Sequence, residues 1–520
     1  MFFLPPDSDN PTGLVVSASD LAAGSACLFA LKRRLDVRTG LALPPARKDQ
    51  EMLDLLRDRG LAHEYRVLEG FAADREVAAV TTTEGAFSRE QLEQGHNDTM
   101  AALSSGADVV YQGSFFDGSF HGKADFLVRE DSGAWSVNDT KLASKIKPEY
   151  LIQLAAYADQ LLAAGVPVHP YARVILRDGT PAEAELEKVL PKFRAVRDRI
   201  TGALAEHLAT GAPAAWDPKG DGACRLSTCP ECQEAAAAAD DLLLVAGMPG
   251  AKKYRTLLRS QGITTVTGLA TAALDEPDAK LAGLQDQARL QAGTGGFDGE
   301  TGGVRYRVVD RTALEELPAP DPGDIFFDFE GDPNRLEPSD GTWGLEYLFG
   351  LLARPLANPD AAPVFHPLTA HDREQERKAF TDFIELVAAR RKARPEMHIY
   401  HYAHYEKNAL TQLAARHGIF ADEVEELNAE VLVDLRPVVS RSIRISEKSL
   451  SIKKLEPLYR PAVREGVANA VDSITAYSAY ADAAAAGDTA AAEEVLGSIL
   501  AYNLDDCEST LQLRDWLLSL

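Results

Sequence analysis

Residues 123–141 read KADFLVREDSGAWSVNDTK. Two apolar runs with strand composition flank the turn signal EDSGA, so we expect a β-hairpin here. The second run ends in Asp139, Thr140 and Lys141, and a charged group at the end of an apolar run costs stability unless it is used. Residues two apart on a strand project from the same face, so Asp139 and Lys141 should lie together, with Asp125 beside them. Two carboxylates and an ammonium would suit a divalent metal ion that activates water.

The residues that follow the hairpin extend this pattern. A helix is expected near Pro148, and on it Gln153 and Tyr157 are four apart and share a face that looks back at the acids. The full order is Asp125, 13 residues, Asp139-x-Lys141, 11 residues, Gln153-x-x-x-Tyr157. It resembles the RecB-like branch of the PD-(D/E)XK nucleases, over about residues 15–235. A lone Asp-x-Lys at a strand edge is usually a surface ion pair, whereas the full order is far rarer by chance.

The resemblance assigns a further metal ligand upstream. His63 lies in RGLAHEYRVLEGF, on an expected helix, and matches the histidine that this branch adds to its metal site. Alone, it would be an ordinary histidine on a helix face.

Four cysteines surround these motifs. Cys27 precedes them, and Cys224, Cys229 and Cys232 follow in CRLSTCPEC. One thiolate before the core and three after it resembles the AddB-type and CRISPR adaptation nucleases, which implies a 4Fe-4S cluster, although four thiolates could equally bind structural zinc. Either centre would staple segments about 200 residues apart. Cys507 is left over and is expected to be a buried thiol.

The middle of the chain resembles a helix-hairpin-helix element. Residues 242–272 read LLLVAGMPGAKKYRTLLRSQGITTVTGLATA. Free backbone N–H groups at helix N-termini accept phosphate oxygens, and Lys252, Lys253 and Arg255 are close by. A helical linker that packs on its neighbours is an equally good interpretation.

A second acidic constellation lies near the C-terminus. DIFFDFEGD carries Asp328 and Glu330 two apart on one strand face, and LAYNLDDCESTLQLRDWL places Tyr502 and Asp506 four apart on a helix. Between them, HIYHYAHYEKNAL ends a strand and opens a helix at Glu406.

These parts resemble a DEDDy-type, RNase H-like exonuclease of the YprB-like group, from about residue 320 to the end. The resemblance implies that Asp328, Glu330, Glu406 and Asp506 hold two Mg or Mn ions while Tyr502 orients the attacking water. The middle acid is usually aspartate, so Glu406 departs from the pattern, and Asp434 in VLVDLRP could supply an acid instead. Asp505 points about 100° away from Asp506 and is not expected to take part.

Composition limits the class of protein. The chain has 520 residues, 45% of them hydrophobic, and a formal net charge of -25, which argues against sequence-blind coating of DNA through many phosphate contacts. No apolar run approaches the ~20 residues that cross a bilayer, and MFFLPP does not resemble a secretory signal. We therefore expect a cytoplasmic protein without membrane contact.

Stretches rich in Gly and Pro divide the chain. We expect an α/β protein with a PD-(D/E)XK restriction-endonuclease-like domain at 1–237, a small helical helix-hairpin-helix-like region at 238–300 and an RNase H-like α/β domain at 320–520.

The two resemblances together predict a metal-dependent DNA nuclease, acting as a single-stranded DNA exonuclease in repair, recombination or defence. The alternatives are a non-catalytic scaffold that binds DNA ends and an RNA-processing exonuclease. The order of domains resembles bacterial RecB-like nucleases that continue into a helicase, but the sequence has no Gly-x-x-x-x-Gly-Lys-Ser/Thr loop. The single strands could be supplied by a helicase subunit or by a helicase domain of a longer chain, or the substrate could have ends that are already single-stranded.

Overall fold

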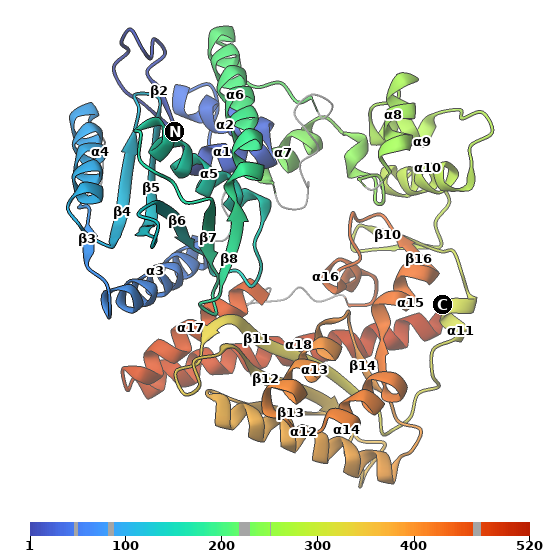
Figure 1. Ribbon diagram of the computed structural model, residues 1–520. Coiled ribbons are helices and arrows are strands. Elements are labelled where there is room, and N and C mark those ends of the chain that lie inside the picture. Colours follow the sequence, from blue (N-terminus) through green and yellow to red (C-terminus); the bar gives the residue numbers. More distant parts are fainter. Residues whose placement is uncertain (46–49, 82–87, 218–228, 250, 461–469) are drawn as a thin grey trace. The chain divides into compact units, whose positions relative to one another are not determined.

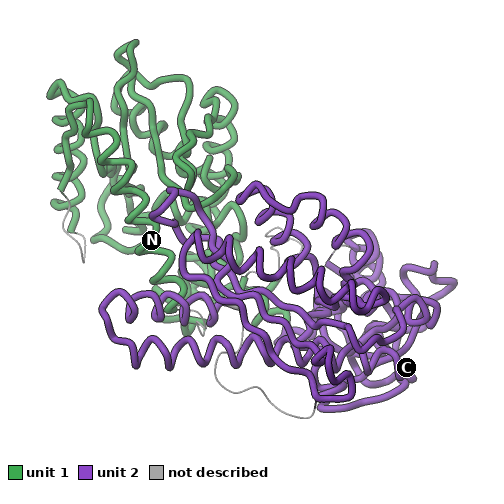
Figure 2. The backbone as a smooth tube through the Cα atoms, turned by 90° about the horizontal axis from the view of Figure 1, so that it is seen from below, with its two compact units in different colours: residues 1–236 green, residues 237–520 purple. Residues whose placement is uncertain are grey.

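The computed structural model describes residues 1–45, 50–81, 88–217, 229–249, 251–460 and 470–520. Within them the chain forms two compact units, residues 1–236 and 237–520, which Figure 2 colours separately. Both units combine helices with mixed sheets, so the predicted α/β class is confirmed. The division into three domains stays a prediction, and the helical region expected at 238–300 is part of the second unit.

The first unit is built around an eight-stranded sheet (Figure 1). The main path runs β1-β2-β5-β6-β7-β8, and β4 pairs with β5 and with β3. The strands are β1 (Phe2–Phe3), β2 (Leu14–Ser17), β3 (Val77–Ala79), β4 (Val109–Phe116), β5 (Phe120–Arg129), β6 (Trp135–Thr140), β7 (Tyr171–Ile175) and β8 (Pro181–Glu185).

Helices cover both faces of this sheet. Val110 and Leu127 pack into a core with α1, α2, α5 and α6, whereas Val109 and Phe126 pack against Phe71 of α3 on the opposite face. This division follows from the period of two along each strand. The helices are α1 (Ala18–Ala26), α2 (Leu28–Thr39), α3 (Gln50–Ala72), α4 (Arg89–Ser104), α5 (Pro148–Ala163), α6 (Leu186–Thr210) and α7 (Pro230–Ala238).

The predicted hairpin is present as β5 and β6, which pair antiparallel with Phe126 opposite Asn138. The next pair in this register is Asp125 with Asp139, and directly opposed residues of an antiparallel pair share one face. Lys141 follows the last residue of β6, and α5 begins at Pro148, as the sequence predicts.

The second unit opens with short helices and a small sheet. The helical elements are η2 (Leu242–Leu244), α8 (Lys252–Ser260), α9 (Val266–Thr271), α10 (Ala279–Ala292) and α11 (Thr312–Glu315). The three-stranded sheet has the order β16-β10-β9 and consists of β9 (Gly299–Thr301), β10 (Val304–Val308) and β16 (Ile443–Ile445).

A five-stranded sheet forms the centre of this unit, in the order β13-β12-β11-β14-β15 (Figure 1). β12 pairs antiparallel with β11 and β13, whereas β14 runs parallel to β11 and to β15. The strands are β11 (Ile325–Leu336), β12 (Trp343–Ala353), β13 (Val364–Thr369), β14 (Ile399–His401) and β15 (Leu432–Asp434).

Alternate residues of β11 face different helices. Phe327 and Phe329 pack with Phe383 of α12, whereas Phe326 lies in the core that contains Leu513 of α18. Asp328 and Glu330 share the parity of Phe326, so they face α18. The helical elements are α12 (Arg373–Ala393), α13 (Tyr405–His417), α14 (Ala421–Glu426), η3 (Leu427–Val431), α15 (Leu435–Ser442), α16 (Ile452–Leu455), η4 (Glu456–Leu458), α17 (Ala470–Ala485) and α18 (Thr489–Ser519).

Across the described residues, every helix is either too short or too polar for a membrane crossing.

Candidate functional site

In the first unit, the hairpin brings two acids and a lysine together. Asp139 is 4% exposed and forms an ion pair with Lys141. Asp125 Oδ2 accepts hydrogen bonds from the backbone N–H and the hydroxyl of Thr140, both at 2.8 Å. These contacts turn the Asp125 carboxylate toward the end of β6, where Asp139 and Lys141 lie.

The charges of this cluster affect one another. Burial raises the pKa of Asp139 to about 7, and the neighbouring Asp125 carboxylate adds to the rise. Burial lowers the pKa of Lys141, but the carboxylates of Asp139 and Asp125 more than offset that effect, so the net shift is upward. Lys141 therefore stays charged beside an acid that ionises reluctantly.

The other residues predicted for this site lie in different surroundings. Tyr157 is buried. Burial is the main cause of its raised pKa, and the charges of Asp139 and Asp125 add to the rise. Gln153 instead donates to Ser19 Oγ at 3.2 Å. His63 is 3% exposed, its Nε2 lies 3.4 Å from the carbonyl oxygen of Ile175, and burial lowers its pKa.

Sequence reasoning missed Glu64, which lies beside His63 on α3. It is 8% exposed and accepts a hydrogen bond from Gln112. Burial raises the pKa of Glu64, and the charge of Asp125 raises it further. Gln112 has a φ of 57°, a conformation that costs energy for a residue with a side chain. The sequence signal that could have identified Glu64 is its position next to His63, because two adjacent polar residues are unusual on the face of a helix that packs on a sheet.

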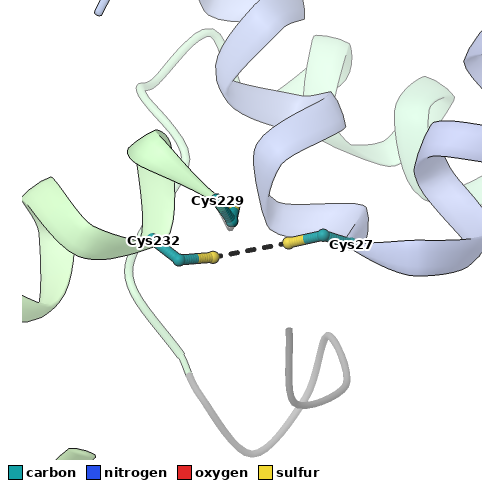
Figure 3. A group of neighbouring side chains, drawn as sticks. All are labelled: Cys27, Cys229 and Cys232. Carbon is teal, nitrogen blue, oxygen red and sulfur yellow. Dashed lines mark hydrogen bonds between the residues drawn. The ribbon is translucent and has the colours of Figure 1, made fainter. Parts of the chain in front are cut away.

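Three cysteines converge elsewhere in the first unit (Figure 3). The sulfur atoms of Cys27, Cys229 and Cys232 lie within 4.8 Å of one another, and those of Cys27 and Cys232 are 3.4 Å apart. Cys27 stands at the N-terminus of α2, where its sulfur accepts from the N–H of Ala30, and Cys232 lies on α7. Segments about 200 residues apart therefore meet at one cluster of thiols. The fourth predicted ligand, Cys224, lies outside the described residues.

In the second unit, three acids form a compact triad. Asp328 and Glu330 come from β11 and Asp506 from α18, and one carboxylate oxygen of each lies within 4.8 Å of the others. Two charges at that separation repel by about 3 to 4 kcal/mol at an effective dielectric of 20. In the described part of the chain, groups of three or more potential metal ligands at this spacing are limited to this triad and the cysteine cluster.

The chemistry of the triad fits a hard divalent cation. Glu330 is 5% exposed, and its burial raises its pKa to about 8; a hydrogen bond with Ser473 opposes this rise, and the charge of Asp506 adds to it. A cation among the three carboxylates would relieve that repulsion, and oxygen donors are those that Mg and Mn prefer.

Two neighbours on α18 complete the arrangement around the triad. Tyr502 is one turn before Asp506, and its pKa is raised by burial and by the charge of Asp506. Asn503 donates from Nδ2 to Asp328 Oδ2 at 2.8 Å. The helix thus supplies one acid, one phenol and the amide that orients a second acid.

Residues 325–518 match the family model of the RNase H superfamily. A comparison with curated proteins found no match for the chain. The RNase H superfamily match covers the five-stranded sheet and nearly all of α18, and it indicates a nuclease-like function, which is a hydrolase activity on nucleic acid.

In the matched segment, residues 325–518, which we call the RNase H-like unit, the fourth predicted acid lies outside the triad. Glu406 is buried near the start of α13, and its Oε2 lies 3.0 Å from Nδ1 of His401. Burial raises the pKa of Glu406, and the contact with His401 opposes the rise. Its role as a metal ligand stays a prediction.

The two other acids that the sequence analysis considered have separate partners. Asp434 accepts from the N–H groups of Ala403 and Arg436, at 2.8 and 2.9 Å, and thereby caps α15. Asp505 pairs with Arg460 at 2.6 Å, on a different side of α18 from the triad.

Sequence reasoning did not predict three further contacts in this unit. Asn503, His401 and Lys453 touch Asp328, Glu406 and Tyr502, respectively. Asn503 lies within the quoted Tyr502–Asp506 motif, which was a usable signal. Lys453 comes from a segment about 50 residues away, and its position follows from tertiary packing alone.

The helical region near residue 250 has exposed lysines. Lys252 and Lys253 at the start of α8 are exposed, whereas Arg255 is only 7% exposed, so it is poorly placed for the phosphate contact considered from the sequence. Burial lowers the pKa of Arg255, as does its neighbour Arg259.

Proposed function

We propose that the RNase H-like unit is a metal-dependent nuclease whose centre is the triad Asp328, Glu330 and Asp506. The observation that carries the proposal is the meeting of three carboxylates, from a strand and a distant helix, within 4.8 Å in a segment that matches the RNase H superfamily. Two Mg or Mn ions bound there, with Glu406 turned inward as a fourth ligand, would act as Lewis acids and activate water. Tyr502 would orient that water.

Single-stranded DNA is the proposed substrate, in an exonuclease reaction that serves repair, recombination or defence. The support is the resemblance of the motifs to DEDDy-type exonucleases. A helicase that supplies single strands is the proposed partner. RNA cleavage and DNA-end binding without cleavage are the competing outcomes.

Purified protein incubated with end-labelled single-stranded DNA or RNA, with Mg or Mn, distinguishes these outcomes. We expect degradation of single-stranded DNA that stops when the metal is chelated. In a Lys141→Ala background, which removes cleavage by the first unit, Asp506→Asn should abolish it, whereas Asp505→Asn, on the same helix but paired with Arg460, should retain most of it. Preferential RNA cleavage would change the substrate class, and binding without cleavage would reject the enzyme.

A second nuclease site is proposed in the first unit, with Asp125 and Asp139 as metal ligands and Lys141 beside the attacking water. Its support is the convergence of these three side chains at the end of the hairpin, with Tyr157 buried nearby. His63 is proposed as an added ligand, and Gln153 would have to leave Ser19 to contribute.

The cysteine cluster is proposed to bind a metal centre that joins α2 to α7. The resemblance to AddB-type nucleases favours a 4Fe-4S cluster with Cys224 as fourth ligand. The sulfur atoms of Cys27 and Cys232 are 3.4 Å apart, and all three sulfur atoms lie within 4.8 Å of one another. These distances favour a single zinc ion, because zinc–sulfur bonds of about 2.3 Å in a tetrahedron put sulfur atoms about 3.8 Å apart.

Metal analysis of protein purified without oxygen decides between these centres. A brown protein that absorbs near ~400 nm indicates iron–sulfur, and a colourless protein with stoichiometric zinc indicates the alternative. Protein that contains neither metal would contradict the proposal that the cysteine cluster binds a metal centre.

A further inference from the structure

Lys453 reaches the RNase H-like site from a part of the chain that carries none of the predicted acids. Its Nζ donates a hydrogen bond to the hydroxyl of Tyr502 at 2.7 Å and lies 4.7 Å from the centre of the Tyr502 ring. The lysine charge also lowers the pKa of Glu330, against the larger effect of burial. A cation is thus held within the field of the carboxylate triad.

The segment around Lys453 is anchored to the core. Leu455, in the same short helix α16, is fully buried among residues that pack under α18. The hydroxyl of Tyr402, next to the end of β14, donates to the carbonyl oxygen of Leu450. The chain is therefore held on both sides of Lys453, by a hydrogen bond at Leu450 and by burial at Leu455, in addition to the hydrogen bond that Lys453 itself donates.

The adjacent lysine provides a comparison. Lys454 is the next residue of the helix, so its side chain projects about 100° away from that of Lys453. It is mostly exposed and forms an ion pair with Glu447 at 3.1 Å. The two lysines share sequence context and charge, but Lys453 alone of this pair contacts Tyr502.

The hydrogen bond from Lys453 determines which way the Tyr502 hydroxyl points. An ammonium group has donors only, so the phenol oxygen must accept from it. The phenol hydrogen is then free to be donated elsewhere, and Tyr502 forms a hydrogen bond with Asp506. The resulting direction is Lys453 to Tyr502 to Asp506, which ends on a member of the triad.

We propose that Lys453 is a positioning residue of the nuclease site, which holds the Tyr502 hydroxyl in the orientation needed to align the attacking water. The inference rests on the proposed nuclease function and extends it by one residue. Lys453 acts through Tyr502, so its effect should appear in the chemical step and depend on the phenol.

The test compares Lys453→Met, Lys453→Arg and Lys454→Met for metal-dependent cleavage of labelled single-stranded DNA, with Tm measured for each protein. Every protein, the reference included, carries Lys141→Ala so that the first unit does not contribute to cleavage. A lost hydrogen bond from a charged donor predicts a fall in kcat of about 10- to 100-fold for Lys453→Met, with KM little changed. Lys453→Arg should recover most of that loss, and Lys454→Met should match the Lys141→Ala reference.

The decisive measurement is the double variant Lys453→Met with Tyr502→Phe. If Lys453 acts through the phenol, the double variant is no slower than Tyr502→Phe alone, because residues of one network are not additive. Additive losses, a rise in KM instead of a fall in kcat, or a loss that follows a lower Tm and is not recovered by Lys453→Arg would each overturn the inference. An inactive Lys141→Ala reference would overturn the proposed function of this unit, whereas an active reference with additive losses would overturn only the role of Lys453.

Discussion

Gly350 links the packing of the RNase H-like unit to the geometry of its acids. It lies on β12 directly opposite Asp328 of β11. A Cβ atom at this position would lie 1.6 Å from Oδ1 and 2.7 Å from Cγ of Asn503. Its backbone is not left-handed, so the lack of space, and not conformation, requires glycine there.

Gly350→Ala should therefore displace the Asn503 amide, which donates to Asp328 at 2.8 Å. Forcing a methyl group into a packed interior costs about 1–3 kcal/mol of the free energy of unfolding. Losing the hydrogen bond to a carboxylate costs about 1.5–3 kcal/mol, which corresponds to about a 10- to 100-fold loss of cleavage rate if it is fully felt in the transition state.

Denaturant unfolding and cleavage of labelled single-stranded DNA, both in a Lys141→Ala background that removes cleavage by the first unit, would measure the two effects. Gly497→Ala, on α18 with open space around it, is the matched control and should be neutral or more stable by about 0.5–1 kcal/mol. Adding Asn503→Ala to Gly350→Ala should restore part of the stability, because it removes the atoms that the methyl group meets, but not the activity. Wild-type stability and activity in Gly350→Ala would refute the reasoning.

Three further changes test other parts of the structure. Glu376→Ala should lower the free energy of unfolding by about 3–5 kcal/mol, because this fully buried carboxylate accepts hydrogen bonds from Arg373, Arg416 and His417. As a control, Glu374→Ala at an exposed position on the same helix should cost under about 0.5 kcal/mol. Burial raises the pKa of Glu346 from 4.5 to about 7, so the native state holds its proton longer than the unfolded state and stability falls as the pH rises between these values. Glu346→Gln should therefore reduce the loss of stability between pH 5 and pH 8, by at most about 3 kcal/mol; an unchanged difference in Tm would contradict this. Lys141→Ala, made in an Asp506→Asn background, should abolish cleavage by the first unit and leave DNA binding nearly intact. Lys147→Ala, at an exposed position, is its control. If Lys141→Ala unfolds the protein instead, Lys141 serves as a structural ion pair.

Local spacing carries much of the candidate sites. Asp328 and Glu330 share a face because a strand has a period of two, and Tyr502 and Asp506 align because a helix repeats every 3.6 residues. The same argument places Asp139 near Lys141. These relations hold wherever the element lies, so the sequence alone could predict them once strand and helix were recognised.

Spacing could not predict the contacts between distant segments. Glu406 pairs with His401, and Gln153 donates to Ser19, although the motifs suggested that both would face the acids. A side chain with several rotatable bonds goes to the nearest complementary partner, and that partner depends on how the elements pack. The motif defines which residues are available, and packing decides where each one points.

By itself, the sequence determined the α/β class, the hairpin at 123–141 and the pairs of acids on single elements, because each depends on residues close together in the chain. The resemblance to known families, and not local spacing, predicts that Asp506 meets Asp328 and Glu330 and that Cys27 meets Cys229 and Cys232, and the structure brings both groups together. Only the tertiary structure brought Lys453 to Tyr502 and Asn503 to Asp328. The physical reason is that burial of apolar side chains drives helices onto sheets, and polar groups carried on those elements meet wherever that packing puts them.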